Sequence, residues 1–436
     1  MKWVAGIALL AFATGLRAEE VPLSLAQALD LARKQNPEIL AQAARTEAES
    51  GRAQAIRRTT WPRLFINSGW SRTNTPSMVF AEKLNAGDFT QDDLALDRLN
   101  SPGALSHLTT ALLAEVPLDL AGKVKARVEA QTAAGQASSA AFDEGHQDLR
   151  LRVVEAYRRA ALAQRVTEVA ETALESSRAR ESDVEARVEE GALLRADLLR
   201  VRARRRQRQA ELAERRADAR IAYAVLSRVL GAEPTVTYVP TELPTAPPPL
   251  EGDEASLLLR AHAERPSLRA AGHRLSRQTS TVRGEERSSW PDLAAWGQLQ
   301  DDRGGSTSGQ SGAFGVLLRW SVFDSARGKR VAAATAEANA AELDVRAGRD
   351  QVRLEVETAW RRAQAARERY AATVGGAEEG REALRVVHER YEQGMATLTD
   401  ELETEGASVA AELEELRAAS EAALADAMLL RACGAL

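Results

Sequence analysis

The chain has 436 residues, a formal net charge of −5 and only 4% aromatic residues, while alanine, arginine, glutamate and leucine dominate. This composition favours long helices over a thick globular core, and the mildly acidic balance gives no reason to expect nucleic acid as a partner. The single cysteine, Cys433, excludes an internal disulfide and lies in an apolar run, so it is expected to pack as a small apolar residue.

The first 18 residues, MKWVAGIALLAFATGLRA, are expected to be an export signal. Lys2 precedes an apolar run that ends at Leu16, and the small residue Ala18 suits a cleavage site. The run is too short to cross a bilayer as a helix, and no later stretch approaches the roughly 20 apolar residues that a spanning helix needs. We expect the mature chain to start near Glu19, without a cysteine for a lipid anchor.

The remaining sequence contains two copies of one pattern. Asn36-Pro37 ahead of Trp61-Pro62 corresponds to Arg265-Pro266 ahead of Trp290-Pro291, displaced by 229 residues. Farther on, EEGALLRADLL at 189–199 corresponds to EQGMATLTDEL at 392–402, displaced by 203 residues. Between them, Pro117-Leu118-Asp119 corresponds to Val322-Phe323-Asp324, displaced by 205 residues. The drop from 229 to 205 means that the first copy carries about 24 extra residues before the end of its second strand, and these are interpreted as a polar loop.

The first repeat, residues 19–234, is expected to begin with a short helix. Strands are predicted at about 62–73 and 108–119, followed by a helical hairpin at about 122–230 with its tip near 191. Apolar positions spaced alternately four and three apart, from Leu149 to Leu174, indicate a coiled-coil seam.

A proline-rich linker at 235–254 is expected to be extended and exposed. The second repeat, 255–436, is expected to have strands at about 291–302 and 312–324 and a hairpin at about 327–433 with its tip near 394. Between these strands, RGGSTSGQSG is interpreted as a flexible loop. One face of the last strand is expected to carry Phe314, Val316, Leu318, Trp320 and Val322.

Four strands per chain are too few to close a membrane barrel, which needs about eight. Open edges are not tolerated in lipid, so we expect the strands to be shared between two or three chains. Five of the seven tryptophans lie on or beside the strands and suit a membrane interface: Trp61, Trp70, Trp290, Trp296 and Trp320. The alternative is a soluble β-sandwich with these tryptophans in its core.

The chain resembles the TolC-like outer-membrane efflux proteins, also called outer membrane factors. The resemblance rests on LSLAQALDLARKQNPEIL, the two Trp-Pro strand entries, PLDLAGK and VFDSARGK, RVEEGALLRADLL and RYEQGMATLTDEL, and VLSRVLG, all in family order. It implies a mainly α protein with a small β part, built from a duplicated helix-strand-strand-helical hairpin unit. It also implies a homotrimer with a twelve-stranded outer-membrane β-barrel continued by a periplasmic α-helical barrel.

The implied function is that of the exit duct of a tripartite efflux or type I secretion system in a Gram-negative bacterium. Such a duct passively conducts substrates from an inner-membrane transporter and a periplasmic adaptor through the outer-membrane lipid. The alternative is a periplasmic coiled-coil scaffold or adaptor without a pore. The five histidines are scattered and no motif indicates an enzyme, a metal site or a cofactor.

The resemblance implies that Gly191 and Gly394 are the hairpin turns at the periplasmic tips, where glycine tolerates positive φ. It also places Asp400 and Glu403 in an acidic ring at the pore constriction, with Tyr391 as a gate residue.

Two further positions lie near the tips. Asp197 is assigned to the constriction, or alternatively is a carboxylate in the first turn of a helix. The basic residue that the family has two positions after the second glycine is Ala396 here.

An arginine-rich run follows the first tip. Arg202 and Arg205 are interpreted as a charge face toward neighbouring helices or an adaptor. The alternatives are a solvated helix face and an RNA-binding run, the latter disfavoured by export.

Overall fold

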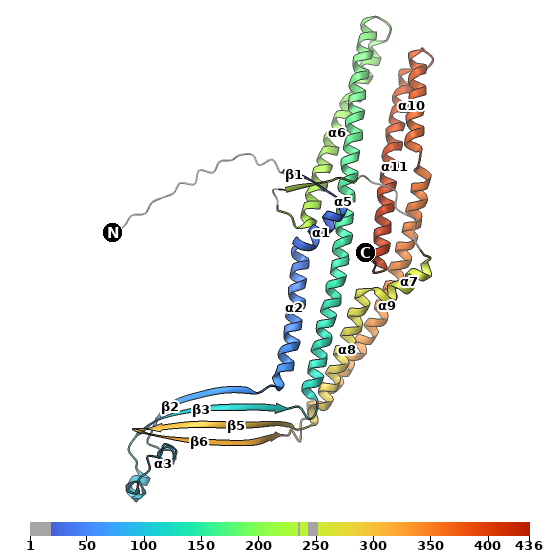
Figure 1. Cartoon of the computed structure of the whole chain (residues 1–436). Coiled ribbons are helices and arrows are strands. Elements are labelled where there is room, and N and C mark those ends of the chain that lie inside the picture. Colours follow the sequence, from blue (N-terminus) through green and yellow to red (C-terminus); the bar gives the residue numbers. More distant parts are fainter. Residues whose placement is uncertain (1–18, 234–235, 243–251) are drawn as a thin grey trace, which may run out of the picture. The chain divides into compact units, whose positions relative to one another are not determined.

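The structure is a computed structural model that describes residues 19–233, 236–242 and 252–436 (Figure 1). The expected export signal and part of the expected linker lie outside the described residues. The α-helices are α1 (Leu25–Gln35), α2 (Pro37–Arg57), α3 (Pro76–Asn85), α4 (Leu96–Asn100), α5 (Lys123–Glu189), α6 (Arg195–Leu230), α7 (Glu254–Glu264), α8 (Pro266–Glu286), α9 (Arg327–Thr373), α10 (Gly376–Glu392) and α11 (Leu398–Ala432). The strands are β1 (Glu19–Leu23), β2 (Arg63–Thr73), β3 (Leu105–Leu118), β4 (Val236–Pro240), β5 (Asp292–Gly304) and β6 (Thr307–Arg319).

These elements form two compact units. The hairpin unit comprises the chain up to Ala44, Ala140–Leu268 and Gly348–Leu436, and the sheet unit comprises Arg45–Ser139 and Arg269–Ala347. Several long helices pass from one unit into the other, and α5 alone has 67 residues. Within the described ranges, no helix is both long enough and apolar enough to cross a membrane.

The duplication is visible in the hairpin unit at the corner that ends the first helix of each repeat. The side-chain amide of Asn36 donates to the carbonyl oxygen of Val229 at the end of α6, 2.9 Å away. Arg265 holds the equivalent place in the second repeat and donates to the carbonyl oxygen of Ala432 at the end of α11, 3.3 Å away. Each repeat therefore ties its corner to the returning helix of its own hairpin.

A glycine follows each returning helix at this contact. Gly231 and Gly434 have φ values of 74° and 76°. A Cβ on Gly231 would lie 2.8 Å from the carbonyl oxygen of Gln35, and one on Gly434 would lie 3.1 Å from Cα of Arg265. Both the left-handed backbone and the close approach require glycine at these two positions.

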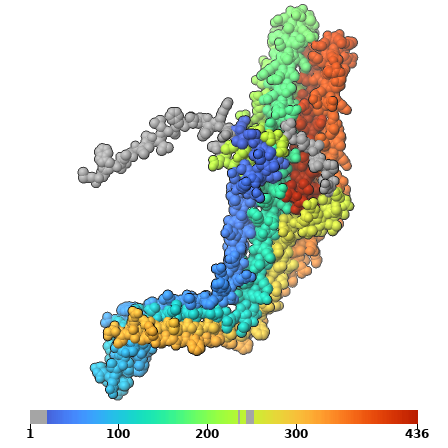
Figure 2. Space-filling view, in the orientation of Figure 1, coloured from blue at the N-terminus to red at the C-terminus, as the bar shows by residue number. Residues whose placement is uncertain are grey.

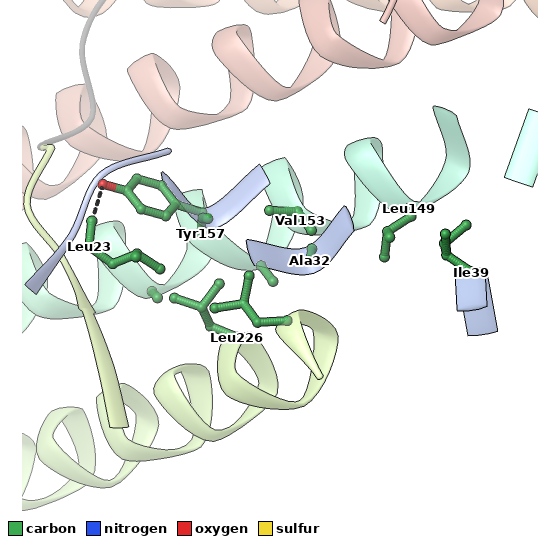
Figure 3. Close-up of a cluster of buried hydrophobic side chains, with 11 residues drawn as sticks. Leu23, Ala32, Ile39, Leu149, Val153, Tyr157 and Leu226 are labelled. Carbon is green, nitrogen blue, oxygen red and sulfur yellow. Dashed lines mark hydrogen bonds between the residues drawn. The ribbon is translucent and has the colours of Figure 1, made fainter. Parts of the chain in front are cut away.

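The core of the first repeat lies where α1, β1, α5 and α6 meet (Figure 3). Val153 and Leu226 are fully buried there, and each such side chain stabilises the fold by about 1.5–3 kcal/mol. The hydroxyl of Tyr157 donates to the carbonyl oxygen of Leu23 at 2.9 Å, which satisfies a polar group inside the cluster.

A short parallel strand pair was missed by the sequence analysis. β1 pairs with β4 in register from Glu19↔Val236 to Leu23↔Pro240. Part of the segment expected to be an extended, exposed linker is therefore a hydrogen-bonded strand, and Pro240 is buried. Five-residue strands whose partners lie more than 200 residues apart leave no local periodicity to detect.

The sheet unit contains an antiparallel sheet in the order β2-β3-β5-β6. Its cross-strand register assigns alternate residues of each strand to one face. One face, called the apolar face below, carries Leu64, Ile66, Leu112, Leu299, Phe314, Val316 and Leu318. The opposite face, called the polar face, carries Asn67, Ser71, His107, Thr109, Gln298, Gln300, Asp302 and Ser311.

The second hairpin of the sheet differs from the expectation. β5 extends to Gly304 and β6 starts at Thr307, so most of the stretch expected to be a flexible loop is strand. Antiparallel pairing overrides the low strand propensity of glycine and serine here. β6 ends at Arg319, so Trp320 and Val322 lie beyond the strand rather than on its face.

The extra residues of the first repeat are also more ordered than expected. The stretch interpreted as a polar loop contains α3, a 3-10 turn at Gln91–Leu94 and α4. Val79 and Ala86 are buried in it, which supplies an apolar contact that such short helices need to be stable.

Candidate functional site at the hairpin tips

The two hairpin turns have the same backbone geometry. Gly191 and Gly394 have φ values of 79° and 73°. After the first turn, the amide of Ala192 donates to the carbonyl of Arg187 at 2.8 Å; after the second, the amide of Met395 donates to that of Arg390 at 2.8 Å. These bonds close the C-terminal end of a helix around a left-handed residue, which explains why glycine recurs.

The two aspartates that follow the turns have different hydrogen-bond partners. Asp400 forms a capping box with Thr397, whose amide and hydroxyl donate to its carboxylate at 2.8 and 2.7 Å. The counterpart of Thr397 in the first hairpin is Leu194, which provides no side-chain cap. Asp197 instead accepts a hydrogen bond from Arg200, 3.4 Å away.

The capping box also holds the charge of Asp400. The hydrogen bonds from the Thr397 side chain and backbone lower the pKa of the Asp400 carboxyl below its ordinary value of 3.8. Because the pKa of Asp400 is lowered in the folded protein, its contribution to stability is complete above the ordinary pKa of 3.8. The contribution is lost as the pH falls below 3.8 and through the lowered pKa of the folded state. Asp400 and Glu403 are both exposed, so two negative charges face solvent near this tip.

An apolar cluster joins the tips of the two hairpins. It contains Val184, Leu198 and Val201 from the first hairpin and Tyr391 and Leu398 from the second. The half-buried side chain of Ala396 packs against it, at the position where the family resemblance led us to expect a basic residue.

Tyr391 is buried in this cluster. The guanidinium of Arg187 lies 5.5 Å from the centre of its ring, within the range of a cation–π contact. Burial raises the pKa of the Tyr391 phenol, although Arg187 opposes this.

A buried ionic cluster beside the apolar one also joins the hairpins. Arg180 of α5 pairs with two residues of α11: Glu401, 3.2 Å away, and Glu405. Nδ1 of His388 lies 2.7 Å from the Glu401 carboxylate. Next to the turn, Arg200 donates to the hydroxyl of Thr399 at 3.1 Å. The hairpins are thus held together at Arg180 and Arg200, without a basic side chain at residue 396.

The sequence analysis did not identify Arg180, His388, Glu401 or Glu405 as site residues. A signal was present, because the buried residues of α11 near its start follow the same three-and-four spacing that was recognised in α5: Leu398, Glu401, Glu405 and Ser408. Two glutamates on a buried helix face require a cation, which the linear sequence does not locate. Within the described ranges, no group of three or more His, Cys, Asp or Glu side chains is placed to hold a metal ion.

The arginine run after the first tip is engaged within its own hairpin. Arg202 pairs with Glu181 at 3.2 Å and with Glu185 at 2.5 Å, and Arg205 also pairs with Glu181. These side chains therefore link α6 to α5, and docking of an adaptor on them stays a prediction.

The tryptophans of the sheet unit do not form one group. Trp61, Trp290 and Trp320 are more than half exposed at the end of the sheet where β2 and β5 begin and β6 ends, and exposed Trp70 lies toward the other end of β2. Trp296 differs, because it lies on the polar face, where its ring is 3.1 Å from the position of a Cβ on Gly315.

Comparisons with known proteins agree with this architecture. The family model described as "Outer membrane efflux protein" matches residues 28–232 and 257–435. The chain belongs to this family of TolC-like channels. The resemblance inferred from the sequence is confirmed, and so is the mainly α fold with a small β part and a duplicated unit. A search of the curated proteins gives no match.

Solved structures of several bacterial membrane proteins share the fold. A membrane protein from Pseudomonas aeruginosa is 21% identical with a TM-score of 0.77, over 94% of this chain and 93% of that one. The outer membrane protein VceC of Vibrio cholerae is 18% identical with a TM-score of 0.74, over 94% and 96%. The CmeC outer membrane channel of Campylobacter jejuni is 16% identical with a TM-score of 0.79, over 94% and 85%.

Proposed function

We propose that this chain is the outer-membrane exit duct of a tripartite efflux or type I secretion system and works as a homotrimer. The observation that carries the proposal is the four-stranded sheet, with strands of 11 to 14 residues and two faces of different polarity. A tilted membrane-spanning strand needs about 9–11 residues, apolar on the lipid side. The apolar face would contact lipid, and the polar face would line an aqueous pore.

The edges of the sheet support closure between copies. β2 and β6 are its two edge strands, and an open edge in lipid would leave backbone groups without hydrogen bonds. Strand direction alternates across all four strands. β6 of one copy can therefore pair with β2 of the next in antiparallel fashion, and three copies would supply the twelve strands that the family resemblance implies.

The hairpins would supply the periplasmic part of the duct. A helix of the length of α5 spans about 100 Å, and three sets of such hairpins can assemble into a helical barrel. Substrates would pass from an inner-membrane transporter through a periplasmic adaptor into this barrel, with no chemical step in the duct. The tips of the hairpins, with exposed Asp400 and Glu403, would form its periplasmic aperture.

Two neighbouring residues of β2 offer a test of this proposal. Ile66 lies on the apolar face and is 74% exposed, whereas Asn67 lies on the polar face. Arginine on the lipid side of a membrane strand costs about 2–4 kcal/mol at mid-membrane, while the lumen tolerates it. We expect Ile66→Arg to abolish recovery of a heat-modifiable trimer from outer membranes and Asn67→Arg to preserve it.

The alternative function gives a different result in the same experiment. A periplasmic scaffold or adaptor without a pore would fractionate with the soluble periplasm, and the two variants would behave alike. An undiminished trimer yield from Ile66→Arg would contradict the assignment of the apolar face to lipid.

A further inference from the structure

The residues between β2 and β3, 74–104, are called the cap segment below. They contain α3, the 3-10 turn and α4, and they are the part by which the first repeat exceeds the second. Figure 1 shows α3 at one end of the sheet, and Figure 2 shows the same segment as a projection there. By chain connectivity this is the end at which β2 passes into β3.

The cap segment lies directly on the polar face. A Cβ on Gly304 would lie 3.2 Å from Cβ of Ala86, and a Cβ on Gly309 would lie 1.9 Å from the carbonyl oxygen of Asn85. Both glycines belong to the polar face by the strand register. The end of α3 therefore crosses β6 at backbone contact, which is possible only because Gly309 lacks a side chain, and Ala86 packs with its Cβ on β5 at Gly304.

Polar residues of the sheet are buried next to this contact. Asp302, 1% exposed, lies 2.8 Å from Nε2 of His107 and accepts hydrogen bonds from Thr109 at 2.9 Å and Gln300 at 2.7 Å. These partners all belong to β3 and β5. The sheet alone therefore satisfies the carboxylate, and departure of the cap segment would expose it to water without breaking its hydrogen bonds.

The attachment of the cap segment itself is slight. One polar contact joins Ser71 of β2 to Glu82 of α3 at 3.1 Å, and the other carboxylate oxygen of Glu82 is buried without a hydrogen-bond partner within the described chain. Its buried apolar contact with the sheet is Ala86, which lies against Gly304. A small contact of this kind can open without unfolding the sheet.

We propose that the cap segment is a gate at the outer mouth of the pore. The inference rests on the proposed function, because only in a closed barrel does the polar face line the pore. In the trimer, three cap segments on the polar face narrow the pore at its extracellular end. They limit the size of the substrates that leave the duct. Each gate opens when its cap segment swings off β5 and β6 about its two connections to β2 and β3.

A reversible cross-link tests the gate directly. The variant carries Ala86→Cys and Gly304→Cys in a Cys433→Ser background, because the two Cβ positions are close enough for a disulfide. We expect single-channel conductance in planar bilayers to be low and steady under oxidation. Addition of a reductant raises the mean conductance by about twofold or more as the cap segments are released.

A glycine pair provides a matched second test. Gly309→Val forces the cap segment away from β6, whereas Gly69→Val, also on the polar face, has nothing within 4 Å of its Cβ position. We expect Gly309→Val to raise the conductance without added reagents and Gly69→Val to leave it near that of the parent protein.

The outcomes separate the gate from the duct. Channels whose conductance is unchanged by reduction and by Gly309→Val would overturn the gate and leave the duct intact. Absence of any channel in the parent protein, together with a soluble periplasmic location, would overturn the proposed function and the gate with it.

Discussion

Arg180 is the residue on which the ionic contact between the hairpins depends. Its side chain is 14% exposed, and those of its partners Glu401 and Glu405 are 1% and 5% exposed. Within the described chain, one carboxylate oxygen of each glutamate is buried without a hydrogen-bond partner. The cluster is thus short of positive charge even with Arg180 present, and loss of this side chain would leave two buried carboxylates without their arginine.

Removal of Arg180 should therefore loosen the tips. We expect Arg180→Met to lower the free energy of local opening at the start of α11 by about 3–5 kcal/mol, the usual effect of breaking a buried ion pair on one side. Hydrogen exchange of the amides at the start of α11 measures this. Arg178→Met, at an exposed position of the same helix, is the control.

A compensated variant distinguishes charge from packing. Arg180→Met combined with Glu401→Met and Glu405→Leu replaces all three charges by apolar groups and should recover most of the protection. If the amides of the single and triple variants exchange equally fast, the unpaired buried carboxylates are not the cause of the lost protection.

At the scale of elements, the two hairpins differ in the continuity of their outgoing helix. α5 runs without interruption, whereas its counterpart is divided into α9, which ends at Thr373, and α10, which begins at Gly376. Gly375 has a φ of 86°, outside the helical region. In the first turn of α10 the backbone amide of Ala377 donates to the Glu415 side chain at 3.3 Å. The second hairpin therefore contains a joint that the first lacks.

The sequence of α5 supplies a replacement that should close this joint. The residues of α5 at the same place are Glu171-Thr172-Ala173. We expect the combined change Val374→Glu, Gly375→Thr and Gly376→Ala to fuse α9 and α10, because it removes two glycines of low helix propensity. Amides 374–379 should then exchange more slowly by hydrogen-exchange mass spectrometry.

Gly328→Ala is a suitable control for the joint, since it lies in α9 with nothing within 4 Å of its Cβ position. It should leave exchange at 374–379 unchanged. If amides 374–379 still exchange fast in the triple variant, packing against α11, rather than the two glycines, causes the interruption between α9 and α10.

At the scale of the whole molecule, the proposed function depends on surfaces that one chain leaves incomplete. The sheet has two edge strands and one apolar face, and Asp400 and Glu403 are exposed one turn apart at the tip. In the proposed trimer these carboxylates become a ring of six charges, which favours cations at the aperture.

We expect Asp400→Ala combined with Glu403→Ala to abolish block of the channel by divalent cations added on the periplasmic side in planar bilayers. Asp197→Ala is the matched control, because its carboxylate is half-buried and contacts Arg200. Block that survives in the double variant would reject the acidic ring.

Much of this molecule follows from local sequence pattern. Helix periodicity, the two Trp-Pro entries and the repeated glycine turns define two similar units, because their causes act within a few residues of each other along the chain. The same reasoning separates Gly191 and Gly394 from ordinary loop glycines, since only a left-handed residue closes those helices.

Contacts between distant segments were decided by the tertiary structure alone. The β1–β4 pair, the cap segment on the polar face and the Arg180 cluster each join residues far apart in sequence. Periodicity indicates that one side of a helix or strand is buried, but not which segment covers it. A buried charge such as Glu401 is therefore understood only when packing brings its arginine to it.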